Sequence, residues 1–200
     1  MRIECEVPDG RSGDWTVETF EVGGPEMDAF NLRAMIHPGG RMIEAGTYKK
    51  LCYKGKIIMS NTPAEIQDHL SFIYKAQGNI LINGLGLGMA LKAILEKPEV
   101  KSVTIIEKSQ DVIKLVAPTY NKDPRVTIHW ADAYEWKPPV MASYDYVWHD
   151  IWDDLCIDNL LQMAKLHRKY GKKTKWQGSW GKELCQEYKR RENHHYDFGF

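Results

Sequence analysis

One stretch decides the fold of this chain: Asn79-Ile80-Leu81-Ile82-Asn83-Gly84-Leu85-Gly86-Leu87-Gly88. A short apolar run ends in three glycines at alternate positions, and a helix-forming segment follows from Met89. Glycine allows a sharp turn and lets a ligand approach the backbone with no Cβ in the way. The free N–H groups of a helix start suit an anion or a polar ligand. The stretch therefore predicts a buried strand that feeds a tight turn beside a ligand.

Downstream of this turn, strand-like and helix-like segments alternate. Such alternation predicts an α/β fold with a doubly wound, Rossmann-like, mostly parallel sheet. The expected strands are Ile80–Asn83, Val103–Glu107, Val126–Trp130, Tyr144–His149 and Thr174–Gln177. The expected helices are Met89–Lys97, Gln110–Tyr120, a short piece near Tyr134, and Asp153–Lys169.

The first 60 residues carry a different pattern, in which short strand-like pieces alternate with turn signals. This pattern predicts a small N-terminal antiparallel β-domain. Its expected strands are Trp15–Val22, Leu32–His37, Arg41–Ala45, Tyr48–Tyr53 and Lys56–Met59. A helix is expected from Pro63 to about Lys75, because a Ser/Asn/Thr cap precedes a proline in its first turn. We expect three parts: a β-domain over 1–60, a Rossmann-like domain over 61–182 and a polar tail over 183–200.

The composition excludes several classes of protein. Lys+Arg and Asp+Glu both number 27, so the chain as a whole lacks the basic footprint of a nucleic-acid binder. The basic run between Lys165 and Lys175 is expected to be a solvated helix end. The four cysteines show no zinc spacing and are expected to be free thiols in a reducing compartment. No signal peptide or membrane span is visible, so a soluble, cytoplasmic protein is expected.

Carboxylates follow the expected strands at the edge where such sheets bind their ligands. Glu107 ends the second strand, Asp132 follows the third, and Asp150 and Asp153 follow the fourth. An acid at the end of the second strand is placed to accept hydrogen bonds from ribose hydroxyls. An Asp after the third strand can accept from an adenine amino group. The acids after the fourth can face a sulfonium or an amine, or act as a general base.

The spacing of the glycines narrows the choice of nucleotide. Dinucleotide-binding folds prefer GxGxxG, but the third glycine position of that pattern is occupied by Met89. The chain also lacks the GxxxxGK[ST] pattern of a phosphate loop. GxGxG followed by a later acid, and then by an Asp after the third strand, favours adenosylmethionine. A nicotinamide-dependent oxidoreductase stays open as an alternative.

These motifs resemble those of the spermidine synthase branch of the class I adenosylmethionine-dependent transferases. The resemblance covers about Met42 to Trp152. It is carried by Gly46-Thr47-Tyr48, the hairpin Tyr53 to Met59, Thr62 to His69, the glycine turn, Ile106-Glu107, Ala131-Asp132-Ala133 and Tyr144 to Val147. It implies that Glu107 holds the ribose and Asp132 binds the adenine. It further implies a small amine or other nucleophile as acceptor, with adenosylmethionine or its decarboxylated form as cofactor.

The resemblance gives a list of expected site residues. Asp150 is the expected base or orienter and Asp153 the expected cation-binding partner. The residues expected to bind the cofactor are Asn83, Gly84, Leu85, Gly86, Gly88, Glu107, Lys108, Asp132, Ala133 and Asp150. Secondary candidates are Tyr48, Gln67, His69 and His149, and a cation-binding wall is conceivable from Trp148, Trp152, Trp176 and Trp180. No metal site is expected, and the adjacent His194 and His195 are assigned to the polar tail.

Two departures from the family pattern bear on function. Trp152 is bulky where the family has a small hydroxyl residue, so the acceptor pocket must differ. Only 47 residues follow Asp153, so a sheet shortened at its C-terminal side is expected. Methyl transfer, aminopropyl transfer and non-catalytic binding of adenosylmethionine therefore all stay open. The partner is expected to be a small molecule, without nucleic acid or membrane. A homodimer over the shortened sheet edge is a further possibility.

Overall fold

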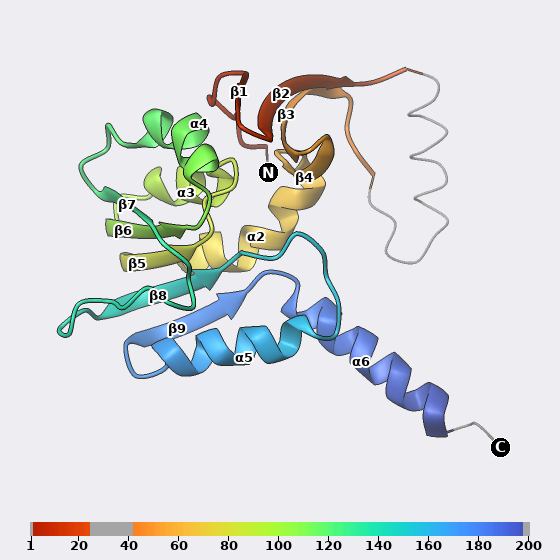
Figure 1. Ribbon diagram of the computed structural model, residues 1–200, viewed down its shortest axis with the longest axis vertical. Helices are drawn as coiled ribbons and strands as arrows, with labels where there is room; N and C mark the ends of the chain where they lie inside the picture. Colours follow the sequence, from red (N-terminus) through yellow and green to blue (C-terminus); the bar gives the residue numbers. More distant parts are fainter. Residues whose placement is uncertain (1, 25–41, 198–200) are drawn as a thin grey trace.

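The computed structural model describes residues 2–24 and 42–197, which form two sheets and five helices (Figure 1). The first sheet is antiparallel, with the order β1-β2-β3-β4. Its strands are β1 (Gly10–Ser12), β2 (Trp15–Val22), β3 (Gly46–Tyr53) and β4 (Lys56–Ser60). The predicted N-terminal antiparallel sheet is thus confirmed.

The second sheet is parallel throughout and has the order β7-β6-β5-β8-β9. Its strands are β5 (Gly78–Asn83), β6 (Val100–Glu107), β7 (Val126–Trp130), β8 (Tyr144–His149) and β9 (Thr174–Ser179). Because the chain runs outward from β5 to β7 and then returns to β8, strand order reverses between β5 and β8. Ligands of doubly wound sheets bind at such a reversal. In the described residues no strand follows β9.

Helices cover both faces of the parallel sheet. They are α2 (Pro63–Lys75), α3 (Met89–Leu95), α4 (Gln110–Tyr120), α5 (Asn159–Tyr170) and α6 (Lys182–Asp197). Ile80 and Ile82 of β5 belong to the core shared with α2, α3 and α4, whereas Leu81 belongs to the core shared with α5 and α6. This alternation explains why the strand is apolar at consecutive positions. The fold class is therefore confirmed as doubly wound α/β.

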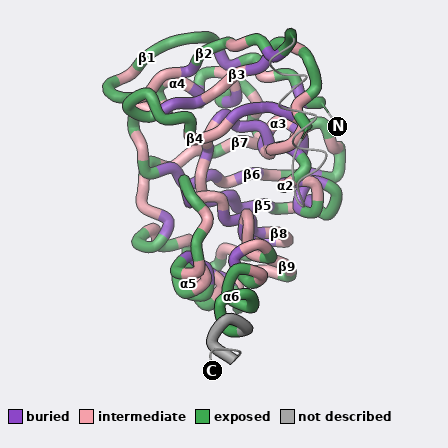
Figure 2. The backbone as a smooth tube through the Cα atoms, turned by 90° about the vertical axis from the view of Figure 1, so that its right-hand side faces the viewer, coloured by how far each residue is buried: buried purple, intermediate pink, exposed green. Residues whose placement is uncertain are grey.

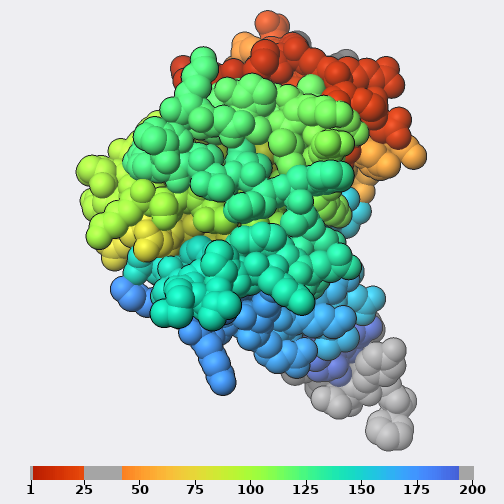
Figure 3. Space-filling view, turned by 60° about the vertical axis from the view of Figure 1, so that its left-hand side comes forward, coloured from red at the N-terminus to blue at the C-terminus, as the bar shows by residue number. Residues whose placement is uncertain are grey.

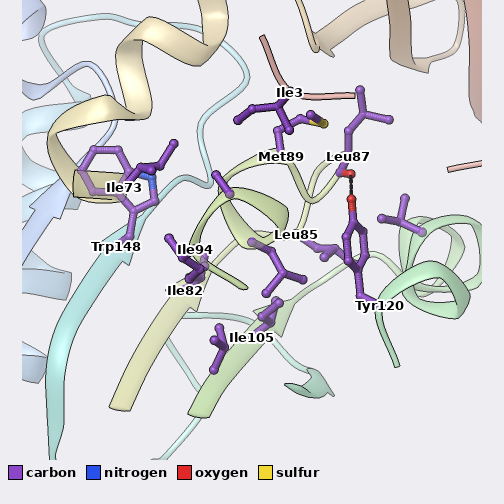
Figure 4. Close-up of a cluster of buried hydrophobic side chains, with 14 of the residues drawn as sticks. Ile3, Ile73, Ile82, Leu85, Leu87, Met89, Ile94, Ile105, Tyr120 and Trp148 are labelled. Carbon is purple, nitrogen blue, oxygen red and sulfur yellow. Dashed lines mark hydrogen bonds between the residues drawn. The ribbon is translucent and has the colours of Figure 1, made fainter. Parts of the chain in front are cut away.

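The buried core lies between the sheets and along the parallel sheet, as the purple stretches of the tube show (Figure 2). Around the glycine turn, Leu85, Leu87 and Met89 pack among residues of neighbouring elements (Figure 4). Tyr120 at the end of α4 is buried, and its hydroxyl donates a hydrogen bond to the Leu87 carbonyl at 3.0 Å (Figure 4). This hydrogen bond thus ties the glycine turn to α4.

The antiparallel sheet packs against α4 and shares one hydrophobic core with the helices and strands of the parallel sheet (Figure 1). Ser12 at the end of β1 donates to the Asp111 carboxylate on α4 at 2.7 Å. The N-terminal segment, in red and orange, lies at one end of the molecule, and the blue C-terminal segment lies at the other (Figure 3). β3 and β4 lie near the carboxyl end of β5, because Met59 of β4 contacts the glycine turn that follows it.

Several predicted boundaries are wrong. The helix predicted from Asp153 begins at Asn159, because the Asn159 side chain accepts the Cys156 N–H at 2.6 Å and keeps the preceding turn outside the helix. The helix from Met89 ends at Leu95, and the piece near Tyr134 is a turn. Strands β5, β6 and β9 are longer than predicted. The polar segment after Gly181 is helical from Lys182 to Asp197.

Two further predicted strands fall wholly or partly outside the described residues. Leu32–His37 lies outside them, as does Arg41. Residues 42–45 form no strand, and β3 begins at Gly46 rather than at Tyr48. In the described part of the chain, all four cysteines are free thiols. None of the described helices is both long and apolar enough to cross a membrane.

Candidate functional site

A cavity of about 410 Å³ opens at the carboxyl ends of β5, β6 and β8, where strand order reverses. The antiparallel sheet, α2 and the segments after β8 and β9 complete its walls. Eight of the predicted site residues line it: Gly84, Gly86, Glu107, Lys108, Asp132, Ala133, Asp150 and Asp153. The sequence motifs and the cavity therefore coincide.

The glycine turn requires glycine because of its close contacts. Gly84 has φ +97°, and a Cβ there would collide with the backbone carbonyl oxygen of Asp150. Gly86 has φ +51°, and a Cβ there would collide with the Met59 sulfur on β4. Side chains rarely adopt this region of φ. The absence of two side chains thus lets β5, β8 and the N-terminal sheet meet at one point.

Glu107 is held beside the turn by backbone donors on both sides. Its Oε2 accepts the Leu85 N–H at 2.8 Å, and its Oε1 accepts the Ser109 N–H at 2.7 Å. Burial raises the pKa of this carboxyl, and the two N–H groups work against that rise. Each oxygen uses one acceptor position in these bonds and keeps another for a ligand.

Asp132 is fixed in a short turn after β7. Its Oδ1 accepts the Tyr134 N–H at 2.6 Å, while its backbone carbonyl accepts from Glu135 and Trp136. Lys169 of α5 donates to the carbonyls of Ala133 and Tyr134, at 2.8 and 2.9 Å. The turn therefore has a fixed shape and places Asp132 in the cavity wall.

Asp150 and His69 face each other at the other end of the cavity. His69 Nε2 lies 3.9 Å from Asp150 Oδ2, and the Asp150 N–H donates to the Asn83 carbonyl at 2.8 Å. Burial raises the pKa of Asp150, and the nearby His69 opposes the rise. The Asp150 side chain keeps 26% of its surface exposed, so its carboxylate is accessible from the cavity. Among the described residues, His69 Nδ1 is one of the buried polar atoms with no hydrogen-bond partner.

Asp153 lies at the exposed rim of the cavity, not within it. The neighbouring Asp154 pairs with Lys56 of β4 at 2.6 Å, which ties the segment after β8 to the N-terminal sheet. Trp152 is buried, and its Nε1 donates to Gln162 of α5 at 2.8 Å. The bulky residue after Asp150 is thus part of the cavity wall.

The sequence motifs do not predict a role in the site for Met59 or Asp68, nor the contact between Trp180 and Asp68. Trp180 Nε1 donates to Asp68 Oδ2 at 3.3 Å, and both residues line the cavity. Met59 reaches the glycine turn from β4. Glu65, Asp68 and His69 share one face of α2, since residues three and four positions apart on a helix are neighbours. This spacing in the sequence is the pattern from which their common position in the cavity wall could be predicted.

Several predicted residues lie outside the cavity wall. Asn83 and His149 are fully buried beneath it, and Asn83 Nδ2 donates to His149 Nδ1 at 2.7 Å. The Trp148 ring stacks on the rings of Phe72 and Trp176, with centroid separations of 5.2 Å and 6.4 Å. The predicted cation-binding wall therefore splits, since Trp152 and Trp180 alone of its four members line the cavity. The other predicted residues outside the wall are Leu85, Gly88, Tyr48 and Gln67.

The basic run at the end of α5 has structural partners. Besides Lys169, Lys173 donates to the Val140 carbonyl at 3.1 Å. Lys175 pairs with Asp145 at 2.6 Å. Three of the six cations from Lys165 to Lys175 are thus engaged within the chain, and the run extends past the end of α5 at Tyr170 into β9, so it is more than the predicted solvated helix end.

The cavity is strongly acidic. Of the described residues lining it, Lys108 is the one lysine or arginine. The carboxylates that line it are Glu65, Asp68, Glu107, Asp132, Asp150 and Asp153. Such a lining favours a cationic ligand and disfavours an anionic one.

Comparison with known proteins gives structural likeness without sequence kinship. No protein-family model and no curated protein matches the chain. Among solved structures, the spermidine synthase of Thermotoga maritima aligns over 82% of this chain and 52% of its own, with 18% identity and a TM-score of 0.44. The N-methyltransferase NodS of Bradyrhizobium japonicum aligns over 55% of this chain and 57% of its own, with 15% identity and a TM-score of 0.41. A putative caffeoyl-CoA O-methyltransferase from Staphylococcus aureus gives 22% identity and a TM-score of 0.41, over 55% of this chain and 51% of its own.

The chain thus spans about half the length of these three proteins. At these identities and scores the likeness adds nothing on activity. The fold assignment rests on the strand order and the two helix layers of the chain itself.

Proposed function

We propose that the cavity binds an adenosyl sulfonium compound of the adenosylmethionine type, and that the chain transfers a carbon group from its sulfur to a small amine. One observation carries the proposal. The Glu107 carboxylate is held by two backbone N–H groups directly beside the glycine turn, at the point where strand order reverses. A carboxylate in that place is suited to a ribose diol.

The rest of the nucleoside end supports this assignment. Asp132 follows the third strand of the parallel sheet, and its free acceptor position suits the amino group of adenine. Ile106, Ala133 and Ile151 supply apolar contacts in the same wall. A purine ring between apolar side chains, with a carboxylate at its polar edge, is a common form of small-molecule site.

The chemistry proposed for the other end is direct displacement. The lone pair of a neutral amine attacks the carbon bound to sulfur, the C–S bond breaks, and a neutral thioether leaves. The nitrogen then carries a surplus proton, which Asp150 accepts. His69 Nε2 lies 3.9 Å from that carboxylate, on the same side of the cavity. Because the sulfonium is already activated, the remaining task of the protein is to align the two reactants.

The acidic lining supports a cationic acceptor. Asp68 contacts the Trp180 side chain and Asp150 lines the same cavity, so an ammonium group finds both opposite charge and an aromatic face. A purely binding role is the competing proposal, because Asp153, the expected cation-binding residue, is exposed at the rim of the cavity. Turnover distinguishes the two.

The test is a product analysis. The protein is incubated with a panel of di- and polyamines and either adenosylmethionine or its decarboxylated form, and the nucleosides are separated by chromatography. Adenosylhomocysteine indicates methyl transfer and methylthioadenosine indicates aminopropyl transfer. Asp150→Asn is expected to lower turnover about 100-fold and to change nucleoside affinity little. Binding without turnover supports the sensor role, and binding of NADH alone contradicts both.

Association of two copies over the free edge of β9 stays a separate proposal. β9 pairs with β8 on one side, and no described strand lies on its other side. Light scattering after size-exclusion chromatography decides it, because the chain mass is 23.1 kDa.

A further inference from the structure

The Met59 side chain packs against the outside of the glycine turn. The residue lies on β4, in the N-terminal sheet, and its side chain crosses to the parallel sheet. The Leu87 N–H points at the Met59 sulfur at 3.1 Å, and the same sulfur occupies the space beside Gly86. A backbone donor of the turn is therefore covered by a thioether, which is a weak acceptor.

The charges near Met59 are negative. The residue after it, Ser60, donates its N–H and its hydroxyl to the Glu65 carboxylate, at 2.6 and 2.8 Å. Asp150 and His69 border the same small hollow as Met59, with a volume of about 10 Å³. Asp68 follows Glu65 on the same helix face.

Of the described residues, no lysine or arginine lines this end of the cavity, and the one histidine there, His69, already faces Asp150 at 3.9 Å. Lys108 follows Glu107 directly and so belongs to the nucleoside end. A carboxylate that entered near Met59 would displace the sulfur from Leu87 and come to lie among Glu65, Asp68 and Asp150. Both steps cost free energy, the second because like charges repel in a partly buried site.

We propose that Met59 is a specificity-determining residue, which closes the glycine turn to the carboxylate of an amino-acid tail. The inference rests on the proposed function, because it concerns the tail of an adenosyl ligand. The ligand class it selects is an adenosyl thioether or sulfonium whose tail carries no carboxylate. Among the two transfers left open, it favours aminopropyl transfer, whose donor has lost its carboxylate.

The test compares two neutral thioethers that share the adenosyl group. Methylthioadenosine has a methyl tail, and adenosylhomocysteine has a zwitterionic amino-acid tail. Isothermal titration of the wild type is expected to give an affinity about tenfold higher for methylthioadenosine. In Met59→Ala the gap is expected to close to about twofold, because the tail gains space and the Leu87 donor. Met59→Leu, which keeps the bulk over the turn, is the matched control and is expected to retain most of the gap.

The outcomes separate this inference from the proposed function. If no adenosyl compound binds the wild type, the proposed function fails. If both bind but adenosylhomocysteine binds as tightly as methylthioadenosine, the function stands and the role of Met59 is overturned. An unchanged ratio in Met59→Ala also overturns it. Thermal melts of both variants establish that they are folded, and the wild-type ratio decides the question even if Met59→Ala is not.

Discussion

The two ends of the cavity are built in different ways. At the nucleoside end, Glu107 and Asp132 each accept a backbone N–H from two residues further along the chain, at Ser109 and Tyr134, and Glu107 also accepts the Leu85 N–H of the glycine turn. At the tail end, Met59 reaches Leu87 across 28 residues and Trp180 reaches Asp68 across 112. The first end is a local property of strand termini, and the second is made by tertiary packing. We therefore expect the first to resist changes elsewhere and the second to respond to them.

The largest effect is expected where the two ends meet, at Gly84. Gly84→Ala combines an unfavourable φ with a collision against the Asp150 carbonyl, and should cost about 3 kcal/mol of unfolding free energy or more. Gly55→Ala is the control, because Gly55 has φ +79° but no atom within 4 Å of its Cβ position. It should cost about 1 kcal/mol. Equal losses in urea denaturation would contradict the role given to the close contact.

The next effect concerns the buried histidine beneath Asp150. Burial lowers the pKa of His149 from 6.5 to about 3, and nearby cationic side chains add to this, against the Gln177 hydrogen bond. The unfolded chain therefore binds a proton between these pH values that the native protein does not. The contribution of neutral His149 is complete above pH 6.5 and is lost as the pH falls, by about 1.4 kcal/mol per unit.

His149→Gln isolates this contribution from that of the buried acids. Glutamine can still donate and accept, so the variant keeps polar partners for Asn83 and Gln177. Urea unfolding between pH 7 and pH 4.5 should show the wild type losing stability more steeply than the variant. Parallel curves would show that His149 is not held neutral by the fold.

A smaller loss of stability is expected at Glu107. Glu107→Gln places an amide NH₂ against the N–H of Leu85 or Ser109, and should cost about 1–3 kcal/mol of stability. Affinity for methylthioadenosine should fall about tenfold, because one ribose acceptor is lost. Glu135→Gln, at an exposed position after Asp132, is the matched control and should change neither quantity. An unchanged affinity of Glu107→Gln for methylthioadenosine would show that this carboxylate does not bind the ribose.

The smallest effect compares two tryptophans, one at each end. Trp180→Phe removes the donor to Asp68 and should cost about 1 kcal/mol. Trp130→Phe removes the donor to the Lys108 carbonyl, but Trp130 is 64% exposed, so water replaces the bond and the loss should stay below about 0.5 kcal/mol. Thermal denaturation of both variants checks the difference. A larger loss for Trp130→Phe would reverse the contrast between the two ends.

The residues of the nucleoside end can be predicted from the sequence because they belong to local patterns. A glycine turn and an acid at the next strand end are local patterns, and the parallel sheet brings their carboxyl ends together. The Met59 contact and the Trp180–Asp68 bond depend on how distant elements pack, so no local pattern announces them. The helix predicted from Asp153 begins only at Asn159, because the Asn159 side chain accepts the Cys156 N–H and keeps the preceding residues out of the helix. Trp148 and His149 are ordinary strand residues by sequence, and only their neighbours make one a stacked core ring and the other a buried polar residue.

The most direct test of the central claim is a crystal structure of the protein with methylthioadenosine at saturating concentration. The two ribose hydroxyls are expected about 2.7 Å from the oxygens of Glu107, with the adenine amino group at Asp132. The methyl tail is expected beside Met59, pointing toward Asp150. A nucleoside bound elsewhere, or bound with its ribose away from Glu107, would show that Glu107 is not the ribose site.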